Sequence, residues 1–102
     1  MKLNLPQDKI AEFCRKWNVS EFALFGSVLR DDFRPDSDVD VLVTWEPDAR
    51  ISLFDYVPMK EELEAMFGRK VDLVSKEGVQ QSRNWIRKRE ILGSARVVYA
   101  NA

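Results

Sequence analysis

Two aspartates enter a hydrophobic strand at alternate positions, and this pattern constrains the fold of the chain more than any other. Residues 38–45 read DVDVLVTW, so that Asp40 stands between two valines. Side chains alternate between the two faces of a strand, so Asp38 and Asp40 point to one face and the valines to the other. Leu42 shares the face of the aspartates further along, so that face is polar at the start of the strand and apolar after it.

Apolar patterns around this segment predict further strands and helices. Residues 21–25 (EFALF), 70–75 (KVDLVS) and 95–100 (ARVVYA) are expected to be strands, and 27–33 (SVLRDDF) a short helix. Two other helices are predicted from apolar residues at helical spacing. The first has Ile10, Phe13, Cys14 and Trp17 in its core-facing stripe and ends at Asn18; the second has Met59, Leu63, Met66 and Phe67, with a capping box at Ser52 and Asp55 and an end at Gly68.

A final helix is expected over about Val79 to Ile91, with Trp85 and Ile86 facing inward. Strands that alternate with helices predict an α/β or α+β fold, a small mixed sheet flanked by helices. A chain of 102 residues has room for a single domain, residues 1–102.

Composition excludes several classes of function. A net charge of −1 gives no sign of broad nucleic-acid binding, and no apolar run is long enough to span a membrane. The N-terminus lacks the apolar core of a signal peptide, so a cytoplasmic location is expected. One cysteine and no histidine rule out an internal disulfide and most zinc and triad chemistries.

The alternating aspartates are best interpreted as ligands of Mg²⁺. Carboxylates side by side repel each other unless a cation lies between them, and Mg²⁺ typically takes one or two carboxylates together with water and phosphate. A solvated acidic loop is the simplest alternative, but it does not explain Asp40 inside the strand pattern. A calcium loop is excluded because its glycine and glutamate positions hold Val41 and Pro47.

A glycine and a serine supply the complementary half of the predicted site. Gly26 allows a tight turn after the strand, and Ser27 would begin a helix whose N–H groups can bind phosphate. Arg30 lies one turn further on and could reach the same anion. Asp72 stands between Val71 and Leu73 in a later strand, and three carboxylates would converge if that strand neighbours residues 39–43.

The segments LFGSVLR, SDVDVLV after a ten-residue spacer, and KVDLV together resemble the minimal nucleotidyltransferase family of the DNA polymerase beta superfamily. The resemblance implies a nucleotidyltransferase fold in which Gly26, Ser27 and Arg30 bind the nucleotide. It also implies that Asp38, Asp40 and Asp72 are catalytic and bind two Mg²⁺ ions, with Asp72 either a metal ligand or the proton acceptor. One departure is Asp31, where many members have glycine.

Small members of this family resemble the antitoxin of HEPN–MNT toxin–antitoxin pairs. The resemblance implies an adenylyltransferase that moves AMP from ATP to a hydroxyl, expected to be a tyrosine, of a partner HEPN toxin ribonuclease. Two alternatives stay open at the level of sequence. The chain could neutralise its partner by binding alone, or it could act on RNA through the basic segment 82–89 (SRNWIRKR). For that segment a solvated helix is the more conservative interpretation.

Overall fold

The computed structural model describes residues 5–26 and 38–100, which form four strands and four helices. The elements in chain order are α1 (Gln7–Trp17), β1 (Val19–Phe25), β2 (Val39–Trp45), α2 (Leu53–Phe67), β3 (Val71–Ser75), α3 (Lys76–Gln80), α4 (Trp85–Ser94) and β4 (Arg96–Ala100). The helix expected at 27–33 lies outside the described residues. In the part of the chain that the structure describes, no helix is long and apolar enough to cross a membrane.

The strands form one mixed sheet in the order β3-β2-β1-β4. β1 pairs antiparallel with both β2 and β4, whereas β2 and β3 run parallel. Because a parallel pair needs a crossover, α2 connects β2 to β3 across one face of the sheet. The predicted fold, a small mixed sheet flanked by helices, is therefore confirmed.

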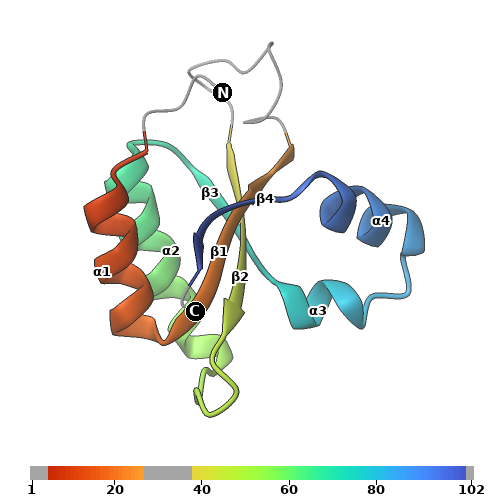
Figure 1. Ribbon diagram of the computed structural model, residues 1–102, viewed down its shortest axis with the longest axis horizontal. Coiled ribbons are helices and arrows are strands. Elements are labelled where there is room, and N and C mark those ends of the chain that lie inside the picture. Colours follow the sequence, from red (N-terminus) through yellow and green to blue (C-terminus); the bar gives the residue numbers. More distant parts are fainter. Residues whose placement is uncertain (1–4, 27–37, 101–102) are drawn as a thin grey trace.

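Helices cover both faces of the sheet (Figure 1), and each face has its own apolar core. α1 and α2 pack on one face, and α3 and α4 on the other. The first core contains Ile10, Phe13, Cys14, Val19, Phe22, Leu24, Val39, Val41, Val43, Met59, Leu63 and Val71. The second core is smaller and contains Ala23, Phe25, Leu42, Val79 and Ile91.

The strand β2 divides its side chains between these cores as its sequence predicts. Val39, Val41 and Val43 are fully buried in the first core, and Leu42 is buried in the second. Asp40 therefore projects from the face that α3 and α4 cover, because it alternates with the valines. This alternation places the polar end of β2 beneath α4.

Local capping explains where α1 and α2 begin and end. Asn18 ends α1 in the left-handed conformation with φ of 57°. Ser52 and Asp55 form the predicted capping box at the start of α2, and Gly68 closes that helix with φ of 67°. Strand β1 begins at Val19, two residues before the expected start, directly after the Asn18 cap.

The single helix expected over Val79 to Ile91 is wrong, because the structure has two helices there. Ser82 Oγ accepts a hydrogen bond from the Asn84 N–H at 3.1 Å, and Asn84 Oδ1 accepts one from the Arg87 N–H at 3.1 Å. Short polar side chains that bind the backbone in this way interrupt one helix and cap the next.

The inward orientation expected for Trp85 and Ile86 is also wrong. These side chains are 65% and 56% exposed, and Ile91 instead anchors α4 in the second core. The interruption before Asn84 starts the helix afresh and changes which residues face the sheet. Ile91, rather than Trp85, is therefore the buried apolar residue of this helix.

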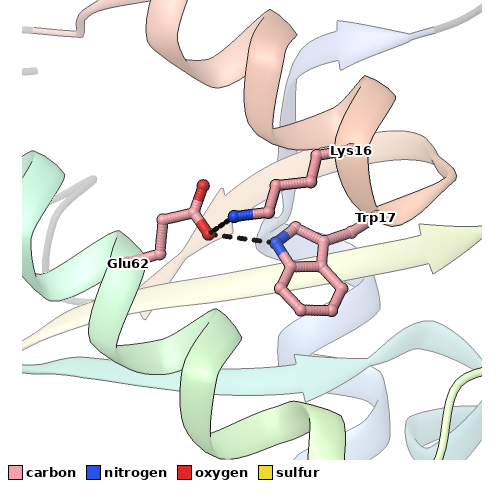
Figure 2. Close-up of polar contacts among 3 residues, drawn as sticks. All are labelled: Lys16, Trp17 and Glu62. Atoms are coloured by element: carbon pink, nitrogen blue, oxygen red, sulfur yellow. Dashed lines mark hydrogen bonds and ion pairs between the residues drawn. The ribbon is translucent and has the colours of Figure 1, made fainter.

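Trp17 lies at the rim of the first core rather than inside it. It is partly buried, and its indole N–H donates to Glu62 Oε2 of α2 at 3.1 Å (Figure 2). Lys16 Nζ lies 3.1 Å from the same oxygen and 5.3 Å from the indole ring centroid. Trp17 therefore links the end of α1 to α2, whereas Ile10 and Phe13 are buried as predicted.

Candidate active site

The predicted site residues that the structure describes lie at one end of the sheet. β1 ends at this edge, β2 and β3 begin there, and Gly26 follows the last residue of β1. Ser27 and Arg30 lie outside the described residues. The end of β1 therefore lies at the same edge as the starts of the two strands that carry the aspartates (Figure 1).

Strand register places the aspartates of β2 and β3 beside each other. Asp40 pairs with Asp72 across the parallel strands and with Phe25 across the antiparallel ones. Side chains of register partners project to the same face. The condition for convergence, that the strand with Asp72 neighbours residues 39–43, is met.

A hollow of about 600 Å³ lies over this row of residues, between the sheet edge and α4. It is lined by Phe25, Gly26, Asp40, Asp72, Arg87, Glu90, Ile91 and Ser94. Asp38 is exposed just before β2 and is not part of this lining. The hollow thus joins two of the three predicted carboxylates to Gly26.

Gly26 is required by a close approach as well as by its backbone conformation. Its φ is +75°, a region that side chains with a Cβ rarely adopt, and a Cβ there would collide with the carboxylate of Asp40. The sequence predicted a tight turn at Gly26. The structure adds that the absent side chain makes room for Asp40.

The donor set suits a hard cation that is shared with a substrate. Within residues 5–26 and 38–100, no three His, Cys, Asp or Glu side chains gather closely enough to hold a metal ion. Mg²⁺ does not require such a cage, since one or two carboxylates suffice when water and phosphate complete its shell. Asp40 and Asp72, as neighbours on one wall of the hollow, fit that requirement.

Arg87, Glu90 and Ser94 are lining residues that the sequence did not identify. They occur on α4 together with Ile91, at spacings of three, four and seven residues from Arg87. Residues so spaced share one face of a helix. A usable signal was present, because Arg87 lies four residues before an isoleucine that could anchor the helix.

Comparison with known structures defines the class of this fold as nucleotidyltransferase. A solved minimal nucleotidyltransferase superposes with a TM-score of 0.66 at 30% identity, covering 88% of this chain and 86% of that one. A toxin–antitoxin crystal structure with AMP-PNP superposes with a TM-score of 0.71 at 17% identity, covering 95% and 75%.

Sequence comparison gives the family. Residues 8–98 match the family described as "Nucleotidyltransferase domain", and the chain belongs to it. The protein adenylyltransferase MntA of Thermococcus cleftensis is 39% identical over 69 residues, 68% of each chain. A relative from Methanocaldococcus jannaschii with a similar name is 36% identical over 64 residues, 63% of this chain and 64% of that one.

Replacing Gly26 with alanine is expected to reduce nucleotidyl transfer by about 100-fold or more. The new methyl group would displace the Asp40 carboxylate, and misplacing a reacting group by about 1 Å can have this effect. Transfer rate and melting temperature are to be measured together.

Gly68→Ala is the matched control for this substitution. Gly68 also has a positive φ, +67°, but a Cβ there would meet nothing within 4 Å. Both variants should lose stability because a residue with a Cβ is strained at positive φ, whereas only Gly26→Ala should lose transfer. Equal transfer by the two variants would contradict the close-approach explanation.

Proposed function

We propose that this protein transfers AMP from ATP to a hydroxyl group of a HEPN-type toxin, and so acts as the antitoxin of that toxin. The observation that supports the proposal most strongly is the hollow in which Asp40 and Asp72 lie beside each other, next to Gly26. Two carboxylates near the starts of adjacent strands, with a glycine just after the end of a third, suit the binding of a metal–nucleotide complex.

The proposed reaction is an in-line displacement at the α-phosphorus of ATP. The acceptor oxygen forms a bond to this phosphorus while the bond to the bridging oxygen of the β-phosphate breaks, and pyrophosphate leaves. The proton of the acceptor hydroxyl passes to a carboxylate, for which Asp72 is the candidate. Asp72 is half exposed at the wall of the hollow, so an incoming hydroxyl could reach it.

Mg²⁺ is the proposed metal, with Asp38, Asp40 and Asp72 as the residues that would hold two ions. When bound, such ions stabilise charge on the attacking and leaving oxygens. Gly26, with Ser27 and Arg30, is proposed to bind the phosphates. The role of the chain's own residues is to orient the triphosphate and to receive the acceptor proton.

A protein acceptor is supported by the names of relatives and by the surface. One structural neighbour is a tri-AMPylated Shewanella oneidensis HEPN toxin in complex with its MNT antitoxin, with a TM-score of 0.61 at 15% identity. In this chain, Leu53, Phe54 and Val57 at the start of α2 are 84%, 90% and 61% exposed. Large apolar side chains that are exposed next to one another often mark a site of protein contact.

Incubation with a HEPN partner, ATP and Mg²⁺ tests the proposal by intact mass. Each modification should add about 329 Da to the partner, the mass of one adenylyl group in this transfer chemistry. Peptide mapping should place the adduct on a tyrosine. An unmodified partner, under conditions in which the two proteins form a complex, would contradict the transferase proposal.

The Asp38→Ala protein separates enzymatic neutralisation from neutralisation by binding alone. It should bind the same partner but leave the mass of the partner unchanged. If it neutralises the toxin as well as the wild type does at equal concentration, the chain acts by occlusion. Labelling of RNA instead of the partner would favour the RNA-directed alternative, which the exposure of Trp85 beside basic residues keeps open.

A further inference from the structure

Among the described residues that line the hollow over Asp40 and Asp72, Arg87 is the only cationic one. Its guanidinium lies 3.8 Å from Asp72 Oδ2, the Arg87 and Asp72 side chains being 57% and 49% exposed. A long, solvent-exposed ion pair of this kind contributes little to stability. The pair therefore does not explain the position of Arg87 at this site.

Three contacts fix the backbone from which Arg87 reaches into the hollow. Its N–H is capped by Asn84 Oδ1 at 3.1 Å, and Lys88 Nζ donates to the Gln80 carbonyl at 2.7 Å, which ties α4 to α3. Ile91, one turn after Arg87, is only 5% exposed and anchors the same helix face in the second core. The base of the Arg87 side chain is thus held, while its end stays accessible.

The charges around the hollow would change when a metal–nucleotide complex enters. Asp40, Asp72 and Glu90 are acidic, so the lining without ligand attracts a guanidinium. A metal ion beside Asp72 would weaken the attraction between that carboxylate and Arg87, and the triphosphate would supply new anionic oxygens in the same space. A planar guanidinium with several N–H donors binds such oxygens well.

We propose that Arg87 binds the phosphates of the nucleotide, and that its contact with Asp72 is the resting position of the side chain when nucleotide is absent. This inference rests on the proposed nucleotide site and adds a binding residue from α4 to it. α4 would then form one wall of the site, and affinity for nucleotide would depend on how α4 packs on the sheet.

The test compares the binding of ATP, AMP and adenosine, each with Mg²⁺, to the wild type and to Arg87→Met. A charge-assisted contact to phosphate should make the dissociation constant for ATP at least about tenfold higher in the variant. The increase should be smaller for AMP and absent for adenosine, which has no phosphate. Arg87→Lys should recover part of the ATP affinity, because it keeps the charge but not the fork of donors.

Arg89→Met is the matched control, since it removes the same charge from the same helix. Arg89 is exposed, does not line the hollow and lies two residues from Arg87, on a different helix face. It should bind ATP like the wild type. An equal loss in both variants would assign the effect to net charge, and an equal loss for ATP and adenosine would assign it to the structure of α4; either result overturns the inference.

Failure of this inference can be told apart from failure of the proposed function. If the wild type modifies its partner and Arg87→Met binds ATP as tightly as the wild type, only the role of Arg87 is wrong. If the wild type binds ATP with the predicted dependence on Arg87 but modifies no partner, the phosphate contact stands and the acceptor is wrong. Arg87→Met could instead bind Mn²⁺ more tightly than the wild type does, with unchanged ATP affinity. That result would mean that the Arg87 guanidinium occupies the position of the metal ion and does not bind phosphate, which also contradicts the proposal.

Discussion

Replacing Asp40 with asparagine is expected to reduce AMP transfer by about 1000-fold or more while the protein stays folded. Asparagine keeps the shape that fits against Gly26 but removes the charge proposed to hold the metal. Losing several kcal/mol of charge stabilisation in the transition state corresponds to this factor. Asp38→Ala should have an effect of the same kind. Transfer is measured as the increase in the mass of the partner protein, and folding is measured by the melting temperature of the variant.

Asp48→Asn is the matched control for the charge. Asp48 is exposed in the turn after β2, at the opposite end of that strand from Asp40. Its replacement should change neither transfer nor stability. Near-normal transfer by both Asp38→Ala and Asp40→Asn would show that these carboxylates do not hold a catalytic metal.

Replacing Phe13 with alanine should lower the free energy of unfolding by about 3–5 kcal/mol. Phe13 is 1% exposed and packs edge-to-face on Phe22, with ring centroids 6.0 Å apart. Since a whole domain is stable by only about 5–15 kcal/mol, the variant would be close to unfolding. Denaturant titration of both proteins measures the difference.

Phe54→Ala is the control for this deletion, because it removes the same side chain from a position that is 90% exposed. It should change the stability by less than about 0.5 kcal/mol. Trp17→Ala should fall between these two variants, since Trp17 is partly buried and hydrogen-bonded to Glu62 at the rim. If Phe13→Ala and Phe54→Ala were equally stable, the placement of α1 over the first core would be wrong.

Local sequence patterns were enough to predict most elements and their ends. Alternation in residues 39–43 depends only on the period of a strand, and the caps at Asn18, Ser52 and Gly68 depend on residues within one turn. The same local logic failed over Val79 to Ile91. There, the hydrogen bonds of Ser82 and Asn84 end one helix and begin another, although apolar residues continue at helical spacing.

The sequence by itself determined that charged residues and a glycine stand at the ends of strands. It therefore determined that Gly26, Asp40 and Asp72 were candidates for one site. Only the tertiary structure decided that Asp40 and Asp72 are register partners, that the Asp40 carboxylate occupies the space a side chain at Gly26 would need, and that Arg87 shares their hollow. The physical reason is the distance along the chain over which each interaction acts. Strand period and capping act over a few neighbouring residues, whereas strand order, parallel register and the side of the sheet that α4 covers are set by packing between segments far apart in the chain.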